Sequence, residues 1–167
     1  TRKNVGKEIV KENLVLNFPK IVKVDWCHSL ITKSIPTAIS MDINGTYFAP
    51  LYLYPETNGQ QTIRQTTERI PNLNTEIVKQ RADKLGLAFT NEKETTKDTF
   101  APIDILDYIY AVLHSPTYRE KYKEFLKIDF PRVPYPKDVA TFWKLVKLGG
   151  EIREIHLLES VSVEKYI

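Results

Sequence analysis

β-branched and aromatic residues dominate the first third of the chain and predict strands there. The runs Ile9–Val10, Leu14–Phe18 and Ile21–Trp26 have this composition, and Asn13 and Pro19 separate them. Such residues pack well on a pleated surface, whereas Asn and Pro are depleted from strands. We therefore expect three short strands before residue 27.

Residues 38–54 carry the pattern of a β-hairpin. Asn44-Gly45 lies between the apolar runs 38–43 and 46–54. A two-residue hairpin turn needs positive φ at both central positions, which Asn and Gly tolerate. Pro50 cannot donate a hydrogen bond to a ladder, so the second strand is expected at an edge or at a bulge.

A polar stretch and then a helix follow the hairpin. Residues 55–73 are rich in amides and lack an apolar period, which predicts a long loop of the kind that is functional or mobile. Asn74 can cap a helix that Gly86 ends, with apolar positions at Ile77, Ala82 and Leu85. A second polar stretch, residues 90–99, precedes the C-terminal region.

The remaining chain has helical periodicity. Pro102 fits the first turn of a helix that is apolar on most sides, and Ser115-Pro116 fits the start of the next one. Three prolines make residues 130–136 extended. A last helix is predicted from Lys137 to about Leu158, in which Gly149-Gly150 either kinks the helix or allows close packing.

These elements predict an α+β fold, with a β-rich N-terminal part that includes the hairpin at 38–54 packed on a C-terminal helical block. The expected division is a β-rich part at 1–55, a polar loop at 56–73, a helical block at 74–160 and a tail at 161–167.

Composition limits the class of protein. The chain has 167 residues, of which 42% are hydrophobic and 27% charged, so one medium domain is expected. No apolar run approaches a membrane span, and we expect a cytoplasmic protein without membrane contact. A single cysteine forbids an internal disulfide or a Cys-rich zinc site. A first residue Thr1 and a lone methionine at position 41 suggest a piece of a longer protein.

The net charge of +3 is concentrated at the front of the chain. Residues 1–55 contain seven basic and four acidic residues, whereas 56–100 and 101–167 are each balanced. This bias is small compared with the basic stripe of an autonomous nucleic-acid binder. From charge alone, a solvated surface is the simpler interpretation.

The motif search finds no catalytic constellation. No glycine pattern cradles phosphates, no acidic residue has lysine two positions on, and the three histidines are isolated, which favours structural roles and no metal site. Cys27-His28 are strand neighbours that face opposite ways, so a core thiol beside a surface imidazole is expected. Asp104 and Asp107 fit helix N-terminal electrostatics. Core packing is favoured over base stacking for three aromatic residues: Tyr47, Tyr52 and Tyr54.

Several segments resemble a bacterial enzyme family. Residues 101–122 resemble its signature DYIYAVLHSPxYRxxY, and residues 125–134 resemble FLKxDFPRIP. Residues 48–55 are similar to FPLYLYP and residues 148–159 to LGxxLRxLHLLE. The family is the C-terminal, specificity-side region of single-polypeptide restriction–modification enzymes, the type ISP and related type IIG adenine-specific DNA methyltransferases.

The resemblance implies a target recognition domain that is not itself an enzyme. In the family, a methyltransferase core binds S-adenosylmethionine and methylates N6 of a flipped adenine through an Asn/Asp-Pro-Pro-Tyr motif. Prolines are never adjacent in this chain, so catalysis and the cofactor would belong to sequence outside it. The implied partners are double-stranded DNA and the methyltransferase core.

Residue types suited to phosphates and base edges then become candidates for DNA binding. They are the amide- and arginine-bearing loop residues and three lysines of the basic front: Asn58, Gln60, Gln61, Arg64, Gln65, Arg69, Lys20, Lys23 and Lys33. The loop could instead be only a solvated linker. Arg132, between two prolines, suits docking on the core or a backbone phosphate, or it caps a helix end. The alternative function is a protein–protein module that couples methyltransferase to helicase or nuclease parts.

Overall fold

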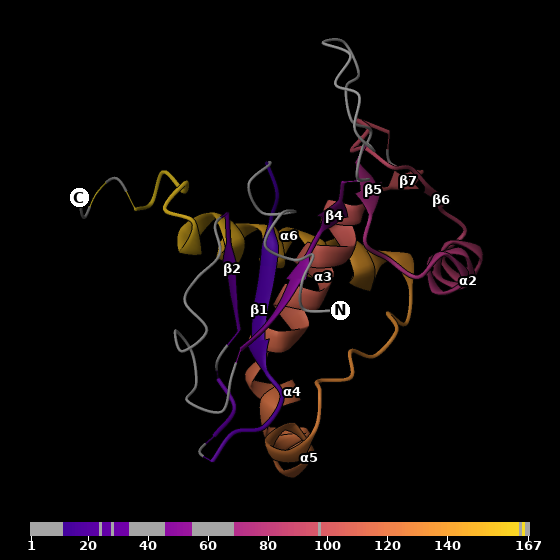
Figure 1. Cartoon of the computed structure of the whole chain (residues 1–167). Helices are drawn as coiled ribbons and strands as arrows, with labels where there is room; N and C mark the ends of the chain where they lie inside the picture. Colours follow the sequence, from indigo (N-terminus) through magenta and orange to yellow (C-terminus); the bar gives the residue numbers. More distant parts are fainter. Residues whose placement is uncertain are drawn as a thin grey trace, which may run out of the picture.

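A three-stranded antiparallel sheet lies in the N-terminal part of the chain, and helices make up most of the C-terminal part, which confirms an α+β fold (Figure 1). The computed structural model describes residues 12–23, 25–27, 29–33, 46–54, 69–96, 98–163 and 165. The sheet has the order β2-β1-β3, with β1 at Val15–Pro19, β2 at Leu30–Thr32 and β3 at Thr46–Pro50.

The predicted strands meet different outcomes. The run 14–18 is confirmed as β1, and the second run of the hairpin as β3, an edge among the described strands. β3 pairs with β1, with Val15 opposite Pro50. The strand predicted at 21–26 is wrong, because Val22 N instead donates to Lys127 O of a helix at 3.2 Å. Residues 9–10, the run 38–43 and the hairpin turn lie outside the described residues.

Two short ladders have no counterpart in the sequence prediction. β4 (Tyr52–Leu53) pairs antiparallel with β5 (Ile70–Pro71), which lies in the stretch predicted as loop. β6 (Ala88–Phe89) pairs parallel with β7 (Thr99–Phe100), at the borders of the second polar stretch. Strands of two residues show no period, so only their long-range pairing defines them.

The predicted start and end signals of the first helix are confirmed. Helix α2 spans Thr75–Leu85, and Asn74 Oδ1 accepts a hydrogen bond from Ile77 N at 3.1 Å. Gly86 ends the helix with φ of 65°, a left-handed conformation that suits glycine. In Figure 1, α2 stands at the side of the molecule, away from the sheet.

Helix α3 (Pro102–His114) is the centre of the core, as expected for a helix that is apolar on most sides. Ten of its thirteen residues are buried, and the aromatic rings of Tyr108 and Tyr110 are almost fully enclosed. Burial of such rings is a large hydrophobic contribution. The next predicted helix is broken at Tyr122 into α4 (Pro116–Lys121) and α5 (Lys123–Ile128).

Helix α6 (Val139–His156) packs against α3 at very short range. A Cβ atom built on Gly149 would lie 1.8 Å from the backbone oxygen of Asp107. Glycine therefore stands here because the helices touch backbone to backbone, which decides in favour of close packing. Beside this contact, Arg153 Nε donates to Asp107 Oδ1 at 2.7 Å.

The structure tests the predictions of structural roles for the histidines and of a buried Cys27 thiol. His114 Nε2 bonds Ser29 O at 3.1 Å and His156 bonds the Tyr110 hydroxyl, so both have structural partners as expected. Cys27 is exposed, so the predicted core thiol is wrong, and His28 lies outside the described residues. Among the described helices, none is long and apolar enough to cross a membrane.

Candidate nucleic-acid interface

A cleft of about 590 Å³ opens where β1, β4 and the C-terminal end of α6 come together, and we call it the ion-pair cleft. Four cationic side chains from distant parts of the chain line it: Lys33, Arg69, Lys93 and Arg153. Lys33 follows β2, Arg69 precedes β5, Lys93 follows β6 and Arg153 belongs to α6. The tertiary fold therefore brings together cationic side chains that are up to 120 positions apart in the sequence, and it places Glu12, Glu92 and Glu159 in the same lining.

Each of these cations is held by a carboxylate. Arg69 Nε donates to Glu92 Oε1 at 2.8 Å, and a second contact makes the pair bidentate. Lys33 pairs with Glu159. Lys93 pairs with Asp104, and Arg153 pairs with Asp107 at 2.7 Å.

The four pairs fall into two kinds by the burial of the carboxylate. The side chains of Asp104 and Asp107 are 3% and 7% exposed, whereas those of Glu92 and Glu159 are 59% and 39% exposed. Asp104 also accepts a hydrogen bond from Ala101 N at 2.8 Å, and so caps α3 as the sequence predicts. Burial raises the pKa of Asp107, and the bonds from Arg153 oppose that rise.

Arg69 is positioned from two sides. Its guanidinium lies over the ring of Tyr52, 4.1 Å from the centroid, a distance typical of a cation–π contact. The hydrogen bond from Arg69 lowers the pKa of Glu92, so this carboxylate is ionised at neutral pH. Burial raises the pKa of Tyr52.

Local bonding explains why Tyr52 is well placed for this contact. Asn13 Nδ2 donates to Tyr52 O at 2.8 Å, and Tyr52 N donates to Asn13 Oδ1 at 3.1 Å. The Asn13 side chain thus makes the two backbone hydrogen bonds that a neighbouring strand would make with Tyr52 of β4. On the other side, Leu53 pairs with Ile70, so the β4–β5 ladder brings together the two described residues that border the stretch 55–68, Tyr54 and Arg69.

The four predicted DNA-binding residues that the structure describes lie in two places. Lys33 and Arg69 both line the ion-pair cleft. Lys20 and Lys23 are elsewhere, because Lys20 lies over the Phe130 ring at 5.0 Å and Lys23 is an exposed neighbour of Val22, which is bonded to α5. The other five lie outside the described residues: Asn58, Gln60, Gln61, Arg64 and Gln65.

Phe130, the ring that Lys20 contacts, lines an apolar cavity of about 410 Å³. Phe18, Tyr47 and Phe130 contact one another at its edge, with ring centroids 4.9–6.4 Å apart. Tyr47 is 41% exposed, so the prediction of core packing is wrong for this ring. Tyr52 is buried, so the same prediction is confirmed for Tyr52.

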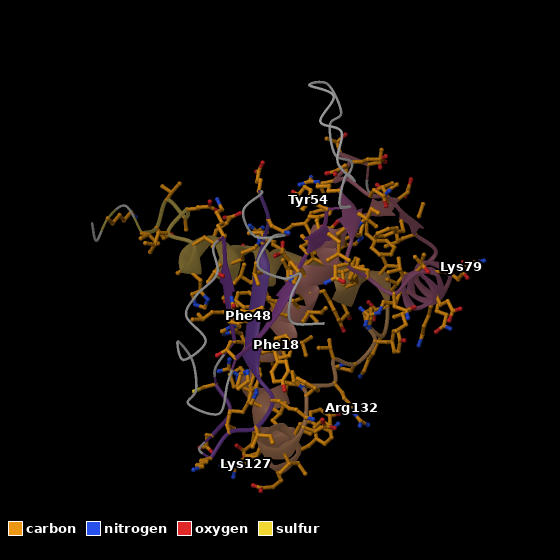
Figure 2. All side chains as sticks on the ribbon, in the orientation of Figure 1. Phe18, Phe48, Tyr54, Lys79, Lys127 and Arg132 are labelled. Atoms are coloured by element: carbon orange, nitrogen blue, oxygen red, sulfur yellow. The ribbon has the colours of Figure 1, made fainter. Side chains whose placement is uncertain are left out.

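Arg132 is on the same end of the molecule as this cavity. Its side chain is 79% exposed, 3.6 Å from Asp129 Oδ2 and over the Phe125 ring at 5.0 Å. Its backbone oxygen accepts a hydrogen bond from the Tyr118 hydroxyl at 3.0 Å, which fixes the extended segment against α4. Figure 2 shows Lys127 and Arg132 at the end of the molecule opposite Tyr54.

From the sequence, Lys33 and Arg69 were identified as candidates, but the other charged residues of the cleft were missed. Lys93 and Glu92 lie in the second polar stretch, which looks like a separator, and Arg153 and Glu159 lie in or just after the last helix. Periodicity places side chains on the faces of one element, but no local signal tells which charges from different elements meet.

The whole sequence matches a known protein family. The family model described as the Type ISP C-terminal specificity domain matches residues 1–167. A search of curated proteins found no significant match.

Two solved structures are similar to the chain. One is the DrdV–DNA complex determined by cryo-electron microscopy, with 26% identity, a TM-score of 0.63, and coverage of 89% of this chain and 12% of that one. The other is a nuclease-deletion mutant of the Type ISP restriction-modification enzyme LlaGI in complex with a DNA substrate mimic. It has 25% identity, a TM-score of 0.54, and coverage of 88% of this chain and 10% of that one. The chain therefore spans about a tenth of the length of these structures.

Proposed function

Since the chain belongs to the family of Type ISP C-terminal specificity domains, we propose that it is a DNA target recognition domain. It positions duplex DNA for a methyltransferase core that lies elsewhere in the polypeptide. The similarity to DrdV and LlaGI, whose structures contain DNA or a DNA mimic, supports this proposal. The observation that carries it is that Lys33 and Arg69 line one cleft and are each paired with an exposed carboxylate, a partner that a phosphate can replace.

The proposed roles follow the chemistry of DNA contacts. Phosphates are bound by Lys and Arg, and base edges are read by Arg, Asn and Gln. In this proposal Lys33 and Arg69 contact phosphates at the cleft, and the candidates for base edges are the residues of the bordering stretch: Asn58, Gln60, Gln61, Arg64 and Gln65. The position of Arg69 supports this division, because it lines the cleft and directly follows that stretch in the sequence.

Lys20, Lys23 and Arg132 have separate proposed roles. Their separation from the cleft would make Lys20 and Lys23 contacts to a more distant part of the duplex. Arg132, exposed at the far end, would dock on the methyltransferase core.

The enzyme context is part of the same proposal. The intact protein would be a bacterial, cytoplasmic restriction–modification enzyme whose core uses S-adenosylmethionine to methylate N6 of adenine. This domain would contribute no catalytic residue and no cofactor ligand. Its contribution would be orientation of the duplex, which lowers the entropic part of the barrier for a reaction on one base.

A coupling role is a second candidate, favoured by the apolar exposure of α6. Leu148 and Ile155 lie seven residues apart on one face of the helix and are 42% and 45% exposed. Exposed apolar stripes of this kind often mark protein contacts. In the intact enzyme, Leu148→Ser with Ile155→Ser should reduce methylation while DNA binding by the domain is unchanged.

The recognition role is tested by fluorescence anisotropy of the chain with a labelled random-sequence duplex. Binding should weaken linearly in a log–log plot against salt, and Lys33→Ala or Arg69→Ala should each reduce the slope by about 0.9 for one lost phosphate contact. Lys127→Ala is the matched control, because Lys127 is paired with Glu124 at the opposite end. Absence of binding at about 50 mM salt, where phosphate contacts are strong, would contradict direct DNA recognition by this domain.

A further inference from the structure

We propose that Glu92 and Glu159 act as internal substitutes for DNA phosphates, holding Arg69 and Lys33 until a duplex displaces them. They would thereby weaken binding to any duplex that uses these two cations, and they would be affinity-limiting residues of the cleft. This inference rests on the proposed function, because it concerns how the same cleft binds DNA.

Burial separates exchangeable pairs from permanent ones. Asp104 and Asp107 are almost completely enclosed, and each has further structural bonds, to Ala101 N or to two atoms of Arg153. Removing a partner from such a carboxylate leaves a buried charge at a high cost. Glu92 and Glu159 are largely exposed, so water can solvate each carboxylate after its cation leaves.

The geometry at Arg69 suits an exchange of one oxyanion for another. Glu92 engages Nε and one terminal nitrogen in a bidentate pair, the same fork that binds two phosphate oxygens. The ring of Tyr52 lies under the guanidinium independently of Glu92. The aromatic contact can therefore keep the cation at the cleft while its anionic partner changes.

Lys33 is also paired with an exposed carboxylate, which comes from a different part of the chain. Its partner Glu159 follows α6 and is 126 residues away in sequence, so no helical spacing explains the pair. Both side chains are substantially exposed, at 61% and 39%. The two exchangeable carboxylates thus enter one cleft from two separate elements, after β6 and after α6.

The expected size of the effect follows from the strength of exposed ion pairs. Such a pair corresponds to a factor of about two to five in an equilibrium constant. Neutralising one carboxylate without changing its shape should therefore tighten binding to random duplex by about that factor.

The experiment measures anisotropy with a labelled random-sequence duplex for the full chain and for Glu92→Gln, Glu159→Gln and the double variant. Glu124→Gln is the matched control: it removes one exposed carboxylate paired with Lys127 on α5, with the same change in net charge. We expect a gain of about two- to fivefold for each cleft variant and a smaller gain for Glu124→Gln. Thermal melts verify that every variant is folded.

A double-mutant cycle tests whether Glu92 acts through Arg69. In an Arg69→Ala background the gain from Glu92→Gln should shrink to the size seen for Glu124→Gln, because the cation that Glu92 occupies is gone. A gain that persists in full would show a general charge effect and overturn the inference, as would weaker binding by Glu92→Gln.

The outcomes also separate this inference from the proposed function. Binding by the unmodified chain without an extra gain in the cleft variants overturns the inference and leaves DNA recognition standing. Absence of binding by the unmodified chain at about 50 mM salt removes the proposed function and the inference with it.

Discussion

The contact between Gly149 and Asp107 predicts that one methyl group distinguishes two adjacent glycines. Alanine at position 149 would place Cβ 1.8 Å from the Asp107 backbone oxygen, and Cβ atoms are essentially never closer than 3.0 Å to such a neighbour. The helices α3 and α6 would have to separate by about 1.2 Å, the difference between these distances. Neither partner can yield locally, because the obstructing atom belongs to the backbone.

Separation of the helices also stretches the ion pair beside them. Arg153 Nε and Asp107 Oδ1 are 2.7 Å apart, so a shift of this size carries them beyond hydrogen-bond distance. Overpacking costs about 1–3 kcal/mol and a hydrogen bond to a charged group about 1.5–3 kcal/mol. Against these, alanine gains about 1 kcal/mol in helix propensity. The net loss for Gly149→Ala is therefore about 2–5 kcal/mol.

Gly150→Ala is the matched control, since its Cβ would meet the Asp107 Oδ2 atom at 3.2 Å and the Arg153 Nη2 atom at 3.7 Å, which are ends of side chains. Chemical and thermal unfolding by circular dichroism compare the two variants. Gly149→Ala should lower the melting temperature by roughly 5–15 °C, and Gly150→Ala should change it by less than about 4 °C. Equal stability of the two variants would refute the reasoning.

Three further predictions concern bonds outside the α3–α6 contact. Asn13→Ala leaves the N–H and C=O of Tyr52 without their partner, and should lower the free energy of unfolding by about 2 kcal/mol or more in urea titration. Asn74→Ala should lower it by about 1 kcal/mol, and Asn74→Gly by only a few tenths. Burial and nearby Arg119 lower the pKa of His114 to about 4, so the unfolded state gains a proton first and stability should fall from pH 6.5 to pH 4. His114→Gln should flatten that part of the pH profile.

Helix ends were predictable from sequence because their signals are local. Asn74 and Gly86 bound α2 through bonds that span only a few residues, and Pro102 and Ser115-Pro116 begin α3 and α4 for the same reason. The strand β1 was also predictable from its β-branched and aromatic residues, although the same composition at 21–26 does not form a strand.

The short ladders and the cleft depend on partners far along the chain. Ile70 and Pro71 form a strand only because they reach Leu53 and Tyr52, and the run 21–26 fails to form one because its backbone bonds to α5. The cleft is likewise a product of long-range pairing, as Lys33 meets Glu159 and Arg69 meets Glu92. The sequence shows which residues are charged, but it does not show which of them form ion pairs.

The β4–β5 ladder has a consequence for engineering. Because Leu53 and Ile70 are paired, the two ends of the connection between them are held next to each other. The entropy of closing such a connection rises by only about 0.6 kcal/mol for each doubling of its length. Segments of different length or sequence can therefore be grafted between these residues while α3 and α6 keep their packing. The ladder is thus a suitable site for inserting exchangeable segments.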